Sequence, residues 1–199
     1  IKPVNPNHIL LSLKKILESN KIISEKTIIN YQQEFRDISM SIINARNFAD
    51  WEDIYKKIVY WELELENISD QALIQIIENQ KEEANAAFFK FIERNYEDWL
   101  YNAEDAPILS HQAFKEVVLP HLDPNEKVLL IMIDNLRYDQ WKVIEPLFNR
   151  YYNSTQEDLY SSILPSATQY ARNAFFAGLT PLDIQKKYPE YWLNDHEEG

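Results

Sequence analysis

Val128-Leu129-Leu130-Ile131-Met132-Ile133 is a run of six apolar residues that stops at Asp134. An apolar run without alternation suits a strand covered on both faces, as in a parallel sheet flanked by helices. In open α/β sheets, ligands bind beyond the carboxyl ends of the strands. The stretch therefore predicts a buried strand over 128–133 that presents an acidic side chain at a ligand-binding edge.

The residues that follow predict a second strand and two helices. The strand is expected over 159–164, with a helix over 140–149 before it. Another helix should begin after Ser166, a good N-cap, and end at Gly178, which suits the left-handed position after a helix. This strand–helix–strand–helix order predicts right-handed crossovers and a parallel sheet, and it brings Thr168 to the edge that carries the acid.

The first half of the chain carries apolar residues at helical spacing. Residues 7–18 predict one helix, which should end near Asn20 and Lys21, and a second helix is expected from Ser24. Three apolar stripes follow, the last within 69–94: Ile28, Tyr31, Phe35, Ile38 and Ile42; Trp51, Ile54, Ile58, Trp61 and Leu65; Leu73, Ile77, Ala84, Phe88 and Phe91. The first two have alternating steps of three and four residues and a short linker between them, which predicts antiparallel packing in a small helical bundle.

Composition excludes several kinds of site. The 199 residues include no cysteine, which rules out disulfides and thiolate metal sites. The two glycines cannot form a glycine-rich phosphate loop. A net charge of −12 disfavours broad binding to nucleic acid. No stretch approaches the roughly 20 apolar residues that span a membrane, so no membrane partner is expected. A cytoplasmic location is a separate expectation.

The residues after the first predicted strand are candidates for a phosphate site. Asp134 suits a divalent cation, and a helix cap or turn acid is the alternative interpretation. The planar guanidinium of Arg137 matches phosphate oxygens, but structural pairing with a nearby acid explains this residue equally well. Asn135 is a further candidate for substrate binding. Asp139 is interpreted as an N-cap rather than as a ligand.

Thr168 is the candidate nucleophile. It falls in the first turn of its predicted helix, where the helix dipole stabilises negative charge. A metal beside its hydroxyl would lower the pKa of that group. A capping hydroxyl is the competing interpretation, although Ser166 is the better cap. The four histidines, His8, His111, His121 and His196, include no pair at metal-ligand spacing.

Two stretches carry a family resemblance, IMIDNLRYDQW at 131–141 and LPSATQYARNAFFAGLTP at 164–181. Residues 128–181 resemble the start of a PglZ domain, a branch of the alkaline phosphatase superfamily. The resemblance implies that Asp134 binds metal and that Thr168 is both nucleophile and metal ligand. It also implies two Zn²⁺ ions and a phosphate-ester substrate, with nucleotides and oligonucleotides as candidates. The remaining ligands are expected beyond Gly199.

The amino end carries a second resemblance. Ile1-Lys2-Pro3-Val4-Asn5 before a helix is similar to the end of a response-regulator receiver domain, where the lysine of a Lys-Pro pair contacts the phosphorylated aspartate. This implies a phospho-signalling role for Lys2. Receiver tail, helical bundle and PglZ-like segment, in this order, resemble PorX-like response regulators of the type IX secretion system. The implied domains are 1–20, 21–106 and 107–199.

The expected fold is therefore an α+β multidomain fragment, cut at both ends, with a helical bundle followed by an incomplete α/β parallel-sheet domain of alkaline phosphatase type. The resemblance implies a two-component response regulator with a zinc-dependent phosphodiesterase domain. It also implies a homodimer, a histidine kinase, and secretion or transcription components as partners. The alternative is a non-catalytic signalling scaffold that uses the bundle for dimerisation and partner docking, which the two heptad seams support.

Overall fold

A computed structural model describes residues 6–66, 68, 70–101, 104–122, 125 and 127–192. Lys2, and with it the predicted receiver contact, lies outside these residues. The chain divides into two compact units, Ile1–Glu97 and Asp98–Gly199. None of the described helices is long and apolar enough to cross a membrane.

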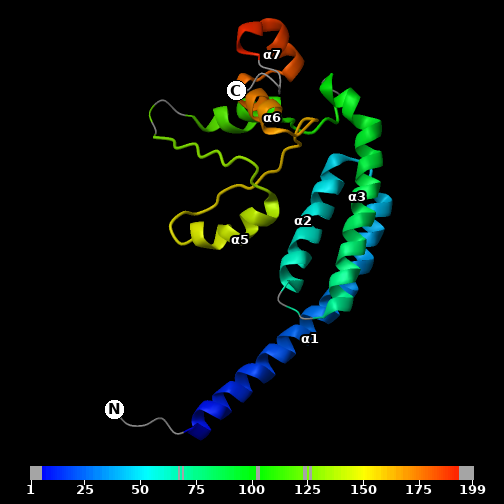
Figure 1. Ribbon diagram of the computed structural model, residues 1–199, viewed down its shortest axis with the longest axis vertical. Coiled ribbons are helices and arrows are strands. Elements are labelled where there is room, and N and C mark those ends of the chain that lie inside the picture. Colours follow the sequence, from blue (N-terminus) through cyan, green and yellow to red (C-terminus); the bar gives the residue numbers. More distant parts are fainter. Residues whose placement is uncertain are drawn as a thin grey trace. The chain divides into compact units, whose positions relative to one another are not determined.

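The first unit is built from three long helices, α1 (Pro6–Asn44), α2 (Phe48–Leu65) and α3 (Gln71–Leu100), of which the last residues of α3 belong to the second unit. Figure 1 shows α2 and α3 beside the carboxyl-terminal half of α1, while the amino-terminal half of α1 runs on past them. Asn47 and Asp50 form a capping box at the start of α2, and the Asp70 carboxylate accepts a 2.9 Å hydrogen bond from the Ala72 N–H at the start of α3.

The bundle core confirms the predicted apolar stripes. Every residue of the three stripes lies in one hydrophobic cluster or packs against it. Ile38 and Ile54 are 0% and 2% exposed, and Trp61 contacts Tyr31 with ring centroids 5.4 Å apart. Helical spacing of apolar residues therefore identifies the buried face of all three helices correctly.

One element boundary in this unit is wrong. The predicted end of a helix near Asn20 and Lys21 and the predicted new start at Ser24 do not exist, because α1 is continuous from Pro6 to Asn44. Residues 7–44 contain neither glycine nor proline. Asn and Ser cost only about 0.5 kcal/mol each inside a helix, which is too little to interrupt it without such a residue.

The core also holds a polar group that its sequence pattern does not reveal. Gln80 is 1% exposed and lies among the apolar stripes. Its amide nitrogen donates to the Phe35 carbonyl at 3.0 Å and to the Ser39 hydroxyl at 3.1 Å, while its oxygen accepts from the Tyr31 hydroxyl at 3.3 Å. Burial raises the pKa of Tyr31 to about 12, so the phenol stays protonated and keeps donating.

The second unit holds the short helices. The α-helices are α4 (Ser110–Ala113), α5 (Tyr138–Phe148), α6 (Thr168–Ala177) and α7 (Pro181–Lys187). α4 continues as a π turn (Phe114–Val118) and a 3₁₀ turn (Leu119–His121), and a second 3₁₀ turn lies at Pro189–Tyr191. α4 packs against α6, and Leu109, Ala113, Ile163, Ala174 and Phe175 are buried. Gly178 has φ +64° after α6, as its predicted left-handed position requires.

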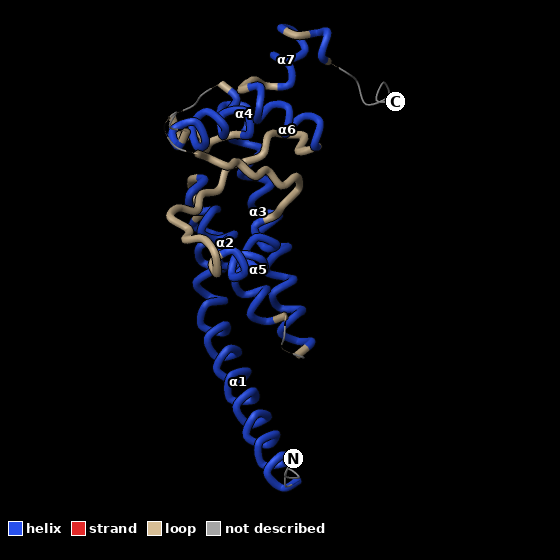
Figure 2. The backbone as a smooth tube through the Cα atoms, turned by 90° about the vertical axis from the view of Figure 1, so that its left-hand side faces the viewer, coloured by secondary structure: helices blue, strands red, loops and turns tan. Residues whose placement is uncertain are grey.

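The predicted strands are not formed in the part of the chain that the structure describes. Residues 128–133 are extended without a ladder partner, and Leu129 is 81% exposed. Figure 2 shows no described segment in the strand colour. The second predicted strand makes one isolated parallel bridge, between Leu109 and Ser161, in which the Ser161 N–H donates to the Ile108 carbonyl at 2.9 Å. A strand needs neighbours for its backbone groups, and the α/β sheet of the expected fold is therefore not confirmed.

Candidate active site

Asp134 lies where the extended run turns toward α5. Asp134 and Asn135 form a turn, and Asn135 has φ +57°, a left-handed conformation that asparagine adopts more readily than most residues. The Asp134 side chain is about half exposed. The turn therefore presents a carboxylate to solvent at the end of the apolar run, at the place where a ligand was predicted.

Arg137 is held by its neighbour. Its Nε and Nη2 atoms donate to the two carboxylate oxygens of Asp139 at 3.0 and 2.8 Å. These hydrogen bonds lower the pKa of Asp139 below its usual value, against a smaller effect of burial. The N-cap position of α5 belongs to Arg137, so the prediction of Asp139 as N-cap is wrong. The structure thus has the pairing that was the alternative interpretation of Arg137.

Thr168 is the first residue of α6 and is partly buried. The N-cap is Ala167, which has no side chain that can cap, so the prediction of Ser166 as N-cap is also wrong. The Ala167 carbonyl accepts from the Tyr170 and Ala171 N–H groups at 3.0 and 2.9 Å, as helix geometry requires at this position. The Thr168 hydroxyl therefore lies at the positive end of the helix dipole and is not the N-cap of its own helix.

Arg172 joins these two segments. Its Nη1 atom lies 3.9 Å from Oδ2 of Asp134, and the two side chains are 49% and 50% exposed. Arg172 follows Thr168 by four residues in α6, so both project from the same face of the helix. Asp134 is therefore brought to the face of α6 that carries Thr168. Arg172 was not predicted from the sequence, although its spacing from Thr168 was a signal for it.

The Glu157 carboxylate fixes α5 next to this turn. It accepts hydrogen bonds from the Tyr138 hydroxyl and Trp141 Nε1, both at 3.0 Å, and from Lys142 Nζ at 3.1 Å. Partial burial opposes ionisation of Glu157, but these donors hold its pKa below the usual value. Lys142 also contacts Glu145 at 2.6 Å. The cluster ties α5 to the segment before Ser161 and so positions the turn at Asp134.

His111 lies in an unusual environment for a histidine. Its Nδ1 atom is buried and has no hydrogen-bond partner in the described residues. Burial lowers the pKa of His111, and the nearby charge of Asp183 only partly opposes this. Asp183 is itself engaged by Thr180, whose hydroxyl donates to it at 2.8 Å. His111 is therefore held in its neutral form more strongly than a histidine in water.

The described residues do not complete a metal site. The Asp134 carboxylate and Thr168 hydroxyl offer oxygen atoms, which zinc accepts as ligands. Within the described ranges, however, no three His, Cys, Asp or Glu side chains are placed so that they could hold an ion together. Any further ligands must come from residues other than these.

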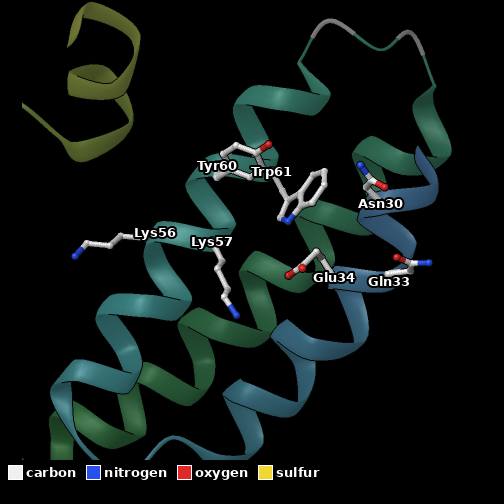
Figure 3. Close-up of a pocket in the computed structure, with 7 residues that line it drawn as sticks. All are labelled: Asn30, Gln33, Glu34, Lys56, Lys57, Tyr60 and Trp61. Atoms are coloured by element: carbon white, nitrogen blue, oxygen red, sulfur yellow. The ribbon is translucent and has the colours of Figure 1, made fainter. Parts of the chain in front are cut away.

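The helical bundle carries a shallow polar groove of about 530 Å³ between α1 and α2. Figure 3 shows its lining, Asn30, Gln33, Glu34, Lys56, Lys57, Tyr60 and Trp61, in which Glu34 from α1 and Lys57 and Trp61 from α2 lie between the two helices. Lys56 also contacts Glu52 at 3.2 Å. The groove mixes positive, negative and neutral groups and has no pair suited to nucleophilic catalysis.

Comparison with known families agrees with the order of parts. Residues 21–100 match the PorX response regulator linker domain. Residues 113–198 match the BREX system PglZ alkaline phosphatase-like domain. The chain has a PorX-like architecture. Both Asp134 and Thr168 fall in the second match, and the first covers α2, α3 and residues 21–44 of α1.

This PorX-like architecture joins a response-regulator linker to a phosphatase-like effector domain. The alkaline phosphatase-like family is generally metal-dependent. No curated protein matches the chain. The predicted roles of Asp134, Asn135, Arg137, Thr168 and Lys2 therefore stay predictions.

Proposed function

We propose that the PglZ-like domain is a zinc-dependent phosphodiesterase that acts on phosphate esters, with nucleotides and oligonucleotides as the substrate class. The observation that supports this most is the 3.9 Å contact between Asp134 and Arg172. Arg172 lies on the same face of α6 as Thr168. Two segments more than 30 residues apart in sequence thus place a carboxylate, a hydroxyl and a guanidinium in one region.

Thr168 is the proposed nucleophile. Its Oγ1 forms a bond to phosphorus while the ester bond to the leaving alcohol breaks, and the hydroxyl proton leaves with that alcohol. The phosphate, now esterified to Thr168 and still carrying its second alcohol, is then attacked by water, which releases a phosphate monoester and returns the hydroxyl. The dipole of α6 stabilises negative charge that develops near its first turn. Asp134 and Thr168 are the two proposed ligands in this chain, and two zinc ions, when bound, would lower the pKa of the hydroxyl and stabilise the phosphate charge.

Two further residues keep their predicted roles as proposals. Asn135 follows Asp134 in the turn and can contact a substrate bound there. Arg137 is a weaker candidate for phosphate, because two of its donors are engaged by Asp139. A phosphate would have to compete with that bidentate pair.

In the complete regulator, we propose that phosphorylation of a receiver domain controls hydrolysis through the bundle and that the output acts on type IX secretion. Lys2 would contact the phosphorylated aspartate. A histidine kinase, a second copy of the chain, and secretion or transcription components are the proposed partners. The direct match of residues 21–100 to a response-regulator linker supports this arrangement.

The test is hydrolysis of a chromogenic phosphodiester by the complete protein, stripped of metal and then supplied with Zn²⁺. We expect zinc to restore activity to the wild-type protein and not to Asp134→Asn, which removes the charged ligand. Asp105→Asn, at an exposed acid of the same unit, is the matched control and should respond like wild type. A rate that is independent of zinc, or an Asp134→Asn protein that responds fully, contradicts the proposal.

A second candidate function is partner docking by the bundle. A groove of about 510 Å³ lies along α3 beside the turn between α1 and α2, and its lining includes Arg46, Lys90, Arg94 and the exposed Ile43. Glu83 is the one acid in this lining. A cationic, partly apolar groove in a chain of net charge −12 favours an acidic partner segment. Charge reversal at Lys90 and Arg94 should then weaken partner binding and leave phosphodiester hydrolysis intact.

A further inference from the structure

Arg172 has donors that nothing in the described structure engages by a hydrogen bond. Its ion-pair contact with Asp134 measures 3.9 Å, which is longer than a hydrogen bond. An ion pair of this length between two half-exposed side chains contributes little to stability. The guanidinium therefore lies near Asp134 without a hydrogen bond to it.

Arg137 lies near the same turn but is committed to a neighbouring acid. It meets Asp139 through two hydrogen bonds of 3.0 and 2.8 Å, in the bidentate geometry that a phosphate would otherwise use. Arg172 has no such pair, and its place one helical turn after Thr168 puts it on the face of α6 that carries the hydroxyl. Arg172 therefore has donors without a hydrogen bond in the described structure, and it lies on the helix face that carries Thr168.

We propose that Arg172 is a substrate-binding residue, which holds the phosphate group of the ester beside Thr168. The proposal rests on the proposed phosphodiesterase function. In the absence of ligand, the contact with Asp134 keeps the guanidinium near the Thr168 face. Because Asp134 is also a candidate metal ligand, a cation bound there would compete with Arg172 for the carboxylate and leave the arginine available to the phosphate. This mutual exclusion distinguishes a substrate-binding role from a purely structural ion pair.

The experiment compares Arg172→Met, Arg172→Lys and the control Arg150→Met in the complete protein. Binding of inorganic phosphate to the zinc-loaded protein is measured by calorimetry, and Zn²⁺ binding to the metal-free protein is measured separately. We expect Arg172→Met to weaken phosphate binding by about tenfold to a hundredfold, the range for hydrogen bonds to a charged group. Arg172→Lys should recover only part of this loss, because lysine lacks the planar fork. Arg150→Met should bind phosphate like wild type.

Zinc affinity separates the two roles of the arginine. If Arg172 competes with a cation for Asp134, the affinity of Arg172→Met for zinc stays the same or increases. A structural role for the pair predicts the opposite: weaker zinc binding, a lower melting temperature and unchanged phosphate affinity. That combination overturns the inference, as does an Arg137→Met variant that loses more phosphate affinity than Arg172→Met.

The outcomes also separate this inference from the proposed function. Phosphodiester hydrolysis with a kcat/KM that Arg172→Met leaves unchanged overturns the role of Arg172 and leaves the phosphodiesterase proposal standing. Wild-type protein that hydrolyses no phosphodiester, yet binds phosphate through Arg172, contradicts the proposed reaction and supports the binding role. Wild-type protein that binds no phosphate in the presence of zinc contradicts the role of Arg172.

Discussion

The stripes of the helical bundle and the run at 128–133 are both strongly apolar, but the stripes are buried and the run is exposed to solvent. In the bundle, Ile38 and Ile54 are essentially inaccessible to solvent, whereas Leu129 in the run is largely exposed. An α-helix satisfies its backbone hydrogen bonds internally and needs only an apolar neighbour, which α1, α2 and α3 supply to one another. A strand depends on other strands for the same bonds. Local sequence is therefore enough to predict the helices of the bundle. It is not enough to predict a strand, because the partners of a strand lie elsewhere in the chain.

Trp61→Ala tests the bundle side of this comparison most strongly. The side chain is buried and contacts Tyr31, so we expect a loss of about 3–5 kcal/mol of unfolding free energy. Phe89→Ala, at a residue that is 64% exposed in α3, is the matched control and should cost much less. Denaturant unfolding of both variants provides the measurement. Equal losses would contradict the assignment of the buried face.

Gln80→Leu tests whether the buried polar network is part of the same core. The substitution leaves the Tyr31 hydroxyl without its partner, and we expect a loss of about 1–3 kcal/mol. In a Tyr31→Phe background the additional loss should be smaller, because the hydroxyl is already gone. A double-mutant cycle by denaturant unfolding measures the coupling. Additive effects would show that the 3.3 Å contact contributes nothing.

His111→Gln tests the packing of α4 and α6 through the pH dependence of stability. Because burial lowers the pKa of His111 in the folded protein, the unfolded chain binds a proton more readily. The contribution of neutral His111 to the free energy of unfolding should be fully present at pH values above the ordinary pKa of histidine. It should be lost as the pH falls from that value toward the lower pKa of the folded state. Melting temperatures at several pH values check this. The variant should lose the decline that His111 causes, and an identical profile would argue against burial of the imidazole.

Leu129→Ser should have the smallest effect on the isolated 199-residue chain. The side chain is already in solvent, so we expect a change within about 0.5 kcal/mol. The matched measurement is the same substitution in a longer protein that contains this segment. If the run pairs there as a covered strand, the cost rises to that of burying a polar group. A large loss in the shorter chain itself would show that the run is packed.

Sequence alone predicts the helical faces well and their ends less well. The stripes from Ile28 to Phe91 are confirmed because a period of about 3.6 residues is a local property. The predicted break between Asn20 and Ser24 is wrong because residues of weak helix propensity do not stop a helix that lacks glycine and proline. Gln80 was missed because one polar residue in a charged helix resembles its solvated neighbours.

Around the candidate site, the placement of Thr168 at a helix start follows from the sequence, but the contacts do not. The cap fell on Ala167 rather than Ser166, a shift within the usual uncertainty of helix ends. Glu157 gathers donors that lie 15 to 19 residues before it, and Arg172 meets an acid in another segment. Such pairings depend on tertiary structure, which local periodicity does not specify.

The most direct test of the central claim is the turnover of Thr168→Val in the complete, zinc-loaded protein, measured with its melting temperature on one preparation. Valine keeps the branched shape and removes the hydroxyl. We predict that kcat for a chromogenic phosphodiester falls by several orders of magnitude, while stability and substrate binding change little, because α6 does not use the hydroxyl as its cap. Near wild-type kcat, with a stability loss of about 1 kcal/mol, would mean that Thr168 is a structural hydroxyl and not the nucleophile.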